Sequence, residues 1–192
     1  MYQMLPRSTK VVIVGGGVIG CSVAYHLTKF GWKDVVLLER DKLTSGTTWH
    51  AAGLVSQLGP SAAVTKIRKY TLDLYKKLEK EVDHSAGLRI NGALSIAQTE
   101  GRWQELQRQA TTAQLYDVDI QLLDKEDMKN KYPMMHVDNL KGGVLMPGDG
   151  AADPSGVTHM LAKGARLGGA KIFEQSPVEA ILTKNGRVCG VR

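Results

Sequence analysis

The stretch Lys10-Val-Val-Ile-Val-Gly-Gly-Gly-Val-Ile-Gly20 decides the fold of this chain. Its four consecutive β-branched residues predict a buried strand, and the residues from Val18 onward predict a helix. Gly15, Gly17 and Gly20 have the spacing G-x-G-x-x-G, which is typical of a dinucleotide-binding turn when a strand precedes it and a helix follows. We expect Gly15 to form the tight turn, Gly17 to allow close approach of a pyrophosphate and Gly20 to let the helix pack on the strand.

Negative charge is expected at the start of this helix, because the first backbone N–H groups of a helix are unpaired and carry partial positive charge. We therefore expect Val18 and Ile19 to meet a diphosphate. The next strand, Val35-Val-Leu-Leu-Glu39, ends in Glu39, 19 residues after the last glycine of the motif. At a spacing of about 20 residues, a carboxylate accepts from the adenosine ribose hydroxyls and repels a 2'-phosphate. The alternative for Glu39 is a solvated acid, and Arg40 either covers the adenine or reaches solvent.

Composition excludes several classes of protein. Of the 192 residues, 43% are hydrophobic and 23% are charged, which is ordinary for a globular protein and argues against disorder. The 25 basic and 19 acidic residues give a net charge of +6, but the basic residues are scattered, so we expect no nucleic-acid partner. No apolar run is long enough for a membrane span. The two cysteines, Cys21 and Cys189, predict no disulfide framework, and we expect Cys21 to be a small packing residue.

The remaining pattern predicts alternating helices and strands. We expect helices over 62–82, 100–116 and 154–167, and a short helix capped by Asp124; the long helix has one apolar face, and Asp153 caps the last one. Strands are expected over 88–97 with a break at Asn91-Gly92, over 120–123, from 142 and over 171–173, followed by a hairpin that turns at Asn185-Gly186. Only part of a doubly wound sheet is visible, so we expect a fragment of a longer protein or a truncated gene product.

Three stretches carry a family resemblance: Leu37-Leu-Glu-Arg, Leu43-Thr-Ser-Gly-Thr-Thr-Trp-His-Ala-Ala-Gly-Leu and Pro147-Gly-Asp-Gly-Ala-Ala-Asp-Pro. The chain resembles the N-terminal part of the FAD-dependent amine oxidoreductases that include sarcosine dehydrogenase, dimethylglycine dehydrogenase and dimethylglycine oxidase. The resemblance implies an α/β fold, with an incomplete Rossmann-like FAD-binding domain and part of an α+β substrate domain. The expected ranges are 1–86 for the first part of the FAD-binding domain, 87–147 for the substrate-domain piece and 148–192 for the continued FAD-binding domain.

The same resemblance implies roles for further residues. His50 matches the histidine that bonds covalently to the 8α carbon of the flavin in that family. Outside such a family a lone histidine is more often a surface or core residue. The backbone of Val178 is implied to meet the adenine. The residues implied to line the flavin or the pyrophosphate are Gly46, Thr47, Thr48, Trp49 and Leu54, although Trp49 equally fits ordinary packing.

The implied reaction is oxidation of an N-methyl amine of the glycine type, sarcosine or dimethylglycine, with hydride passing to flavin N5. The iminium product is hydrolysed or its one-carbon unit is captured by tetrahydrofolate, whose site would belong to a missing C-terminal region. The electron acceptor would be electron-transferring flavoprotein or oxygen. The expected location is the mitochondrial matrix in a eukaryote and the cytoplasm in a bacterium. No catalytic acid or base and no metal ligand is assigned in this chain, and we expect it to be inactive alone.

Two alternatives remain open. One is a non-catalytic relative such as the regulatory subunit of pyruvate dehydrogenase phosphatase, which resembles the same family but lacks histidine at the position of His50. The other is an inert truncated product with half a cofactor site. Retention of His50 favours the enzyme.

Overall fold

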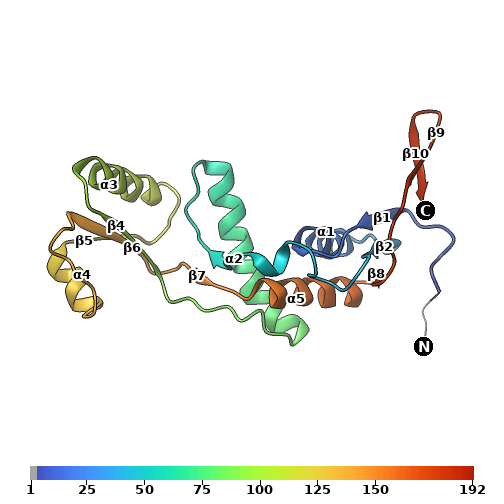
Figure 1. Cartoon of the computed structure of the whole chain (residues 1–192), viewed down its shortest axis with the longest axis horizontal. Coiled ribbons are helices and arrows are strands. Elements are labelled where there is room, and N and C mark those ends of the chain that lie inside the picture. The colour runs from blue at the N-terminus through green and yellow to red at the C-terminus, as the bar shows by residue number, and fades with distance from the viewer. Residues whose placement is uncertain (1–3) are drawn as a thin grey trace. The chain divides into compact units, whose positions relative to one another are not determined.

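The structure, a computed structural model, describes residues 4–192. Contacts divide the chain into two compact units. The first comprises the residues up to Gly53 together with Tyr75–Gly87 and Ala152–Arg192, and the second comprises Leu54–Leu74 and Leu88–Ala151. Both are mixtures of helices and strands (Figure 1).

The first unit is built on a parallel sheet. β1 (Val11–Val14) pairs with β2 (Val35–Leu38), and β2 pairs with β8 (Lys171–Phe173). All four residues of β2 are buried, which explains its uninterrupted apolar sequence. α1 (Val18–Lys29) connects β1 to β2 and packs against α5 (Pro154–Leu167). The predicted β-α-β unit is confirmed.

Local chemistry sets the start of α5 as the sequence predicts. The carboxylate of Asp153 accepts hydrogen bonds from the backbone N–H groups of Ser155 and Gly156, at 3.2 and 2.9 Å, and Pro154 is the first helical residue. These bonds satisfy N–H groups that have no acceptor within the helix. The other elements of this unit are a short 3-10 helix, the C-terminal part of α2 and an antiparallel hairpin: η1 (Thr48–His50), α2 (Ala62–Val82), β9 (Ile181–Lys184) and β10 (Arg187–Val191).

The second unit contains an antiparallel sheet in the order β4-β6-β5 and a short pair formed by β3 and β7. Its elements are β3 (Leu54–Val55), the N-terminal part of α2, β4 (Ala93–Ala97), α3 (Glu100–Gln114), β5 (Gln121–Leu123), α4 (Lys125–Lys131), β6 (Gly142–Met146) and β7 (Gly150–Ala151). Successive residues of β6 belong to two different small cores. Val144 packs with Leu106 of α3, whereas Leu145 packs with Met128 of α4. The period of two along the strand therefore directs one helix to each face.

Several predicted boundaries differ from the structure. The helix over 62–82 and the predicted break at Asn91-Gly92 are confirmed: Gly92 has a φ of +80°, and only β4, after it, is a regular strand. Arg89 forms a single bridge to Ala151 instead. The compact units also differ from the predicted domain ranges at 54–74 and 148–151, since β3 pairs with β7 there. The assignment of those ranges to cofactor and substrate remains a prediction.

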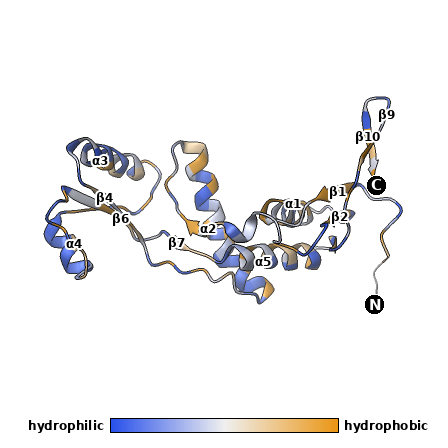
Figure 2. Cartoon of the chain, viewed as in Figure 1, coloured by the Kyte–Doolittle hydropathy of each residue, from blue (hydrophilic) through white to orange (hydrophobic). Residues whose placement is uncertain are grey.

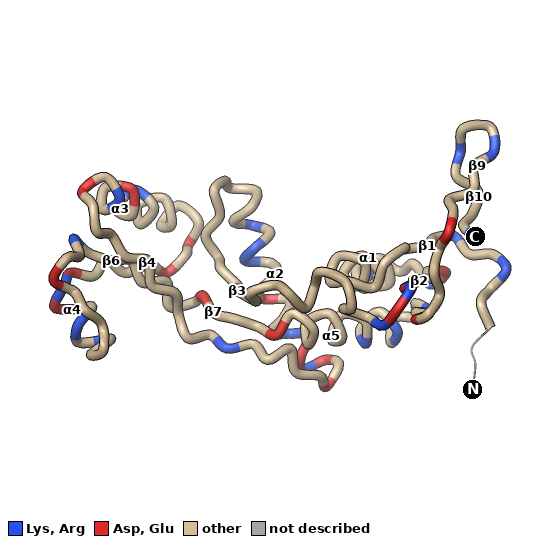
Figure 3. Tube along the Cα trace, in the orientation of Figure 1, with Lys and Arg blue, Asp and Glu red and all other residues tan. Residues whose placement is uncertain are grey.

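Hydropathy differs from element to element, whereas charged residues are spread along the chain. Figure 2 shows apolar colouring along β1, whereas the ribbons of α3 and α4 carry largely hydrophilic colouring. Basic and acidic residues are interspersed along the described chain (Figure 3). Among residues 4–192, no helix is both long and apolar enough to cross a membrane.

Candidate functional site

The glycine turn between β1 and α1 forms the floor of the candidate site. Gly15 has a φ of +108°, a conformation that favours glycine, and its N–H donates to the carbonyl oxygen of Leu38 at 2.8 Å. A Cβ added to Gly20 would lie only 2.0 Å from the carbonyl oxygen of Gly15. The turn and the first turn of α1 are therefore in direct backbone contact. The roles predicted for these two glycines agree with this geometry.

Glu39 reaches this turn from the end of β2. Its side chain is 9% exposed, and Oε2 accepts a hydrogen bond from the N–H of Gly16 at 2.6 Å while Oε1 accepts from the N–H of Asp41 at 2.9 Å. A carboxylate offers about four acceptor positions, so positions for two further donors remain. The solvated-acid alternative is wrong for Glu39, because the side chain is buried and bonded to the glycine turn.

The segment 46–50 is tied to the N-terminus of α1 through Thr48. The backbone N–H of Val18 donates to Oγ1 of Thr48 at 3.1 Å, and a Cβ on Gly17 would lie 2.9 Å from the same oxygen. Gly17 is the N-cap of α1 and has no side chain to satisfy this N–H itself. A hydroxyl from a segment 30 residues away thus caps the helix at the place predicted to hold phosphate.

His50 ends η1 and is exposed to solvent. Its ring lies 3.7 Å from the ring of Trp49, centroid to centroid, with an interplanar angle of 33°. Trp49 is itself 58% exposed, so it does not pack into a core. The two rings present a stacked aromatic surface immediately after Thr48. Gly46 and Thr47, on the other side of Thr48, are also exposed.

The structure also places the remaining predicted residues. The carbonyl oxygen of Glu39 accepts from the N–H of Ser176 at 2.8 Å, so the chain that leads to Val178 leaves the sheet beside the end of β2. Ile19 is 78% exposed at the start of α1. Arg40 points to solvent and forms an ion pair with Asp41 at 3.6 Å. Exposed pairs of this kind contribute little to stability.

Leu54 belongs to the second unit, where it is 81% exposed in β3. Its predicted contact with the flavin remains a prediction.

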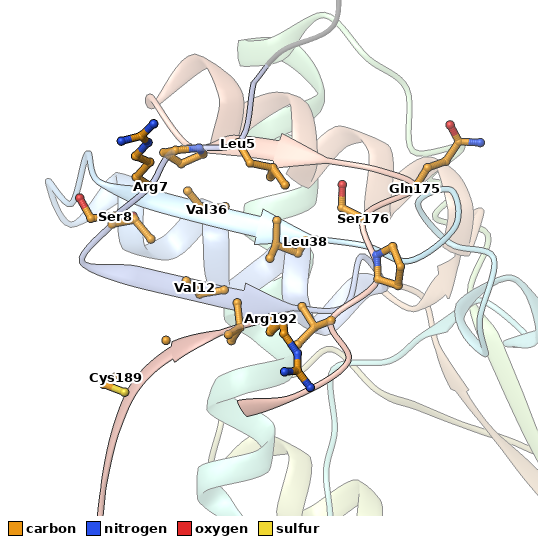
Figure 4. A pocket seen from close by; sticks show the side chains of 16 residues that line it. Leu5, Arg7, Ser8, Val12, Val36, Leu38, Gln175, Ser176, Cys189 and Arg192 are labelled. Carbon is orange, nitrogen blue, oxygen red and sulfur yellow. The ribbon is translucent and has the colours of Figure 1, made fainter. Parts of the chain in front are cut away.

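A cavity of about 570 Å³ lies on one face of the parallel sheet, and Val178 is among its lining residues. Figure 4 shows Val12, Val36 and Leu38 of β1 and β2 pointing into this cavity. α1 packs on the opposite face, where a Cβ at Gly20 would contact the side chain of Ile13. The glycines of the turn, Glu39 and Thr48 do not line the cavity, which is therefore separate from the glycine turn.

Sequence reasoning missed Gly16, the residue between the first two motif glycines. A Cβ there would lie 2.5 Å from Cδ2 of Leu43 and 2.9 Å from Cβ of Glu39. Its N–H also supplies the bond to the Glu39 carboxylate. The run of three glycines was the available signal, since the G-x-G-x-x-G motif requires only two of them. Within residues 4–192, no group of three or more His, Cys, Asp or Glu side chains has an arrangement that would hold a metal ion.

We expect the two cysteines to differ sharply in reactivity. Cys21 is fully buried, and burial raises the pKa of its thiol to about 12; the charge of Arg166 opposes this shift, and the charges of Glu39 and Glu174 add to it. Cys189 is exposed. Because the thiolate is the reactive form, a disulfide reagent at neutral pH should modify Cys189 in the folded chain and Cys21 only after denaturation. Equal rates at both thiols in native protein would contradict the packing described for α1.

Comparison with known proteins relates this geometry to a family. The family described as FAD dependent oxidoreductase matches residues 10–192. Human mitochondrial sarcosine dehydrogenase is 41% identical over 178 residues, covering 92% of this chain and 19% of that protein. Human mitochondrial dimethylglycine dehydrogenase is 38% identical over 176 residues, with coverage of 92% and 20%. The mitochondrial pyruvate dehydrogenase phosphatase regulatory subunit of mouse is 35% identical over 187 residues, with coverage of 97% and 21%.

Among solved structures, the L-proline dehydrogenase from P. horikoshii superposes with a TM-score of 0.89 at 27% identity and covers 97% of this chain and 49% of that one. The chain thus spans about a fifth of the length of these sequence relatives and about half of this structural neighbour. The family model matches the chain from Lys10 to the last residue, and the α/β fold with its glycine turn agrees with that match. The chain belongs to the FAD-dependent oxidoreductase family.

Proposed function

We propose that the protein to which this chain belongs oxidises a small N-methyl amine of the glycine type, sarcosine or dimethylglycine. The observation that carries the proposal is the bond from the N–H of Val18 to Thr48, because it ties the segment bearing His50 to the dinucleotide turn. Similarity to sarcosine and dimethylglycine dehydrogenases supports the substrate class. When bound, FAD accepts a hydride from the methyl carbon of the amine.

The residues of the turn fit FAD. The first turn of α1 offers the N–H group of Ile19 to the diphosphate, beside the N–H of Val18, which donates to Oγ1 of Thr48, and Gly17 has no side chain on this side. The two unused acceptor positions on the Glu39 carboxylate suit the ribose hydroxyls, and the same charge disfavours a 2'-phosphate. We assign the adenine to the backbone of Val178, beside Arg40. In this proposal residues 1–86 and 148–192 hold the cofactor, and 87–147 contribute to the substrate domain.

We further propose that His50 is the covalent attachment point of the flavin. The imidazole is exposed and a neutral imidazole is a competent nucleophile. A bond from the His50 ring nitrogen to the 8α carbon replaces one N–H and one C–H bond. The two protons released from the His50 ring and the 8α carbon would pass to solvent, and oxygen would be the two-electron oxidant. Thr47, Thr48 and Trp49, with Gly46 and Leu54, are proposed to line the flavin or its pyrophosphate.

Glu39 should control affinity for the nucleotide. Changing Glu39→Gln keeps one acceptor oxygen but removes the charge, so the hydrogen bonds to the ribose lose their charge assistance. We expect FAD to bind about tenfold more weakly, which corresponds to about 1.4 kcal/mol. The measurement is the dissociation constant for FAD in a His50→Ala background, where the flavin is free to dissociate. An unchanged constant would show that Glu39 serves only the glycine turn.

The substrate proposal is tested by anaerobic reduction of the flavin in the full-length protein. Sarcosine or dimethylglycine should bleach the absorbance of the oxidised flavin, whereas glycine, which has no N-methyl group, should not. Bleaching by proline alone, or by no N-methyl amine, would overturn the substrate assignment. Reduction of electron-transferring flavoprotein against consumption of oxygen then identifies the acceptor. Formaldehyde release with and without tetrahydrofolate tests for a folate site elsewhere in the protein.

The competing function is that of a non-catalytic relative, and the similarity to the pyruvate dehydrogenase phosphatase regulatory subunit favours it. A protein that binds FAD but turns over no amine would support it. For location we propose the mitochondrial matrix if the source is eukaryotic, since the named dehydrogenase relatives are mitochondrial, and the cytoplasm if it is bacterial.

A further inference from the structure

The motif Pro147-Gly-Asp-Gly150 contains a buried acid to which the proposed chemistry gives no role. Asp149 is 1% exposed, and its Oδ1 accepts a hydrogen bond from the backbone N–H of Gln57 at 2.9 Å. Its Oδ2 has no hydrogen-bond partner among the described residues. Burying a carboxylate costs folding free energy unless its oxygens accept hydrogen bonds or pair with a charge. The bond to Gln57 joins two segments 92 residues apart in the sequence.

The backbone groups of Asp149 bond elsewhere, so its side chain makes this bond. Its backbone N–H donates to the carbonyl oxygen of Met146 at 3.2 Å, and its carbonyl oxygen accepts from the N–H of Gly92 at 2.9 Å. The backbone therefore turns away from β3 immediately before β7 begins. The carboxylate replaces the backbone acceptor that a longer β7 would offer to Gln57.

The two flanking glycines fit the same arrangement. A Cβ on Gly148 would lie 2.1 Å from Nε2 of Gln57, so the Gln57 amide packs directly on the backbone at Gly148. A Cβ on Gly150 would lie 1.9 Å from the carbonyl oxygen of Arg89. Gly148 and Asp149 thus hold Gln57 between them, an arrangement that we call the Gln57 clamp, while Gly150 packs against the backbone of Arg89.

The Gln57 clamp extends a very short strand pair. β3 pairs with β7 through only two residue pairs, Leu54 with Ala151 and Val55 with Gly150. Such a short pair specifies its register weakly, and a slip of one residue would turn every side chain to the other face. The bond from Gln57 to Asp149 adds a third point of attachment on the side away from His50.

The residues after Gln57 are also held by side chains. The carbonyl oxygen of Leu58 accepts from Nη1 of Arg68, and the N–H of Gly59 donates to Oγ1 of Thr65 at 3.0 Å. Three consecutive residues, 57–59, are thus each bonded to a side chain from α2 or from the motif. The connection from β3 to α2 is therefore held in one conformation.

We propose that Asp149 is a positioning residue whose bond to Gln57 holds the register of β3 and, through the short connection from Gly53 back to His50, the position of His50 for flavin attachment. This inference rests on the proposed attachment at His50. Gly53 lies three residues after His50, and its carbonyl oxygen accepts from the N–H of Ala152 at 2.8 Å. A register shift between 53–57 and 149–152 would therefore displace the segment that carries His50. Attachment requires the nitrogen and carbon to be held at reacting distance, so a displacement of about 1 Å is costly.

The chemistry of Asp149 provides a conservative variant. Asp149→Asn keeps Oδ1 as an acceptor for Gln57, whereas Asp149→Leu has a similar volume and no acceptor. Burial raises the pKa of the Asp149 carboxyl, and hydrogen bonds from Gln57 and the charge of Arg68 oppose this shift. The asparagine variant therefore removes a charge that burial disfavours while it retains the bond to Gln57.

The experiment measures the rate of covalent FAD incorporation into the full-length apoprotein, read as intact mass after denaturation. Asp149→Leu should slow incorporation by about tenfold or more, and Asp149→Asn should stay within about threefold of the wild type. Asp124→Ala is the matched control for lost stability. Asp124 also accepts a backbone hydrogen bond, from Asp127 at 2.8 Å, but it caps α4 rather than bonding the segment after β3. Its thermal unfolding midpoint should fall while its incorporation rate stays at the wild-type value.

A wild-type rate of FAD incorporation in Asp149→Leu would overturn the positioning role. Equal slowing in Asp124→Ala would also overturn it, because the slowing would then result from lost stability in general. If Asp149→Leu fails to fold, slowing in Gly148→Ala with rescue in the Gly148→Ala/Gln57→Ala pair supports the clamp, and wild-type incorporation in Gly148→Ala overturns it. Failure of the proposed function gives a different result from failure of this inference. If the wild-type protein acquires no covalent FAD, then His50 is not an attachment point and this inference fails with that proposal.

Discussion

Full-length protein carrying His50→Ala should contain FAD that dissociates completely on denaturation, whereas the wild type should keep one FAD per chain through acid precipitation. His50 is exposed at the end of η1, so its removal leaves no cavity and breaks no core contact. The noncovalent contacts of the glycine turn and Glu39 remain. The loss of covalently bound FAD should be complete, because only a nucleophile held at the position of His50 can form the bond to the flavin. Intact mass before and after denaturation is the measurement.

A matched control for this variant is His136→Ala. His136 is also exposed, with 80% of its side-chain surface accessible, and forms only an exposed contact with Asp138 at 3.4 Å. It lies in the second unit and outside every segment proposed to contact the cofactor. The His136→Ala protein should retain covalent flavin in full. Unchanged covalent flavin in His50→Ala would remove His50 as the attachment point while leaving membership of the family intact.

Gly20→Ala should abolish stable FAD binding and lower the free energy of unfolding by about 3 kcal/mol. Alanine is intrinsically better than glycine inside a helix by about 1 kcal/mol, so propensity alone predicts the opposite sign. The new Cβ would lie 2.0 Å from the carbonyl oxygen of Gly15, a distance no side-chain rotation relieves. Either the turn or the start of α1 must move, and both positions form the predicted phosphate site. Urea unfolding and FAD titration measure the two effects.

The control for this substitution is Gly101→Ala. Gly101 lies in α3, and a Cβ added there meets nothing within 4 Å. This variant should be neutral or more stable by up to about 1 kcal/mol, as expected from helix propensity without a clash. If Gly20→Ala proves as stable as Gly101→Ala, the backbone contact between Gly15 and α1 is looser than described, and Gly20 has no special role.

Much of the fold followed from local chemistry. The β-branched run predicted β1, and Asp153 followed by Pro154 predicted the start of α5. The helix over 62–82 followed from spacings of three and four between its apolar residues. Each of these signals acts within one element or its first turn, so each is readable from neighbouring residues. The tight turn at Gly15 likewise followed from a motif whose spacing is geometrically constrained, whereas the bond from the N–H of Gly16 to Glu39 was not predicted.

The contacts that complete the candidate site join distant segments, and no local pattern indicates them. Thr48 caps α1 from 30 residues away, and Asp149 bonds Gln57 from 92 residues away. Both Thr48 and Asp149 belong to stretches that carry the family resemblance, but neither stretch indicates the partner of its side chain. Sequence by itself determined the elements and the glycine turn, because these depend on short-range sterics and helix dipoles, whereas His50 and Val178 were indicated only by the family resemblance. Only the tertiary structure decided which side chain satisfies which buried N–H group, because that pairing depends on where the folded chain places the two partners.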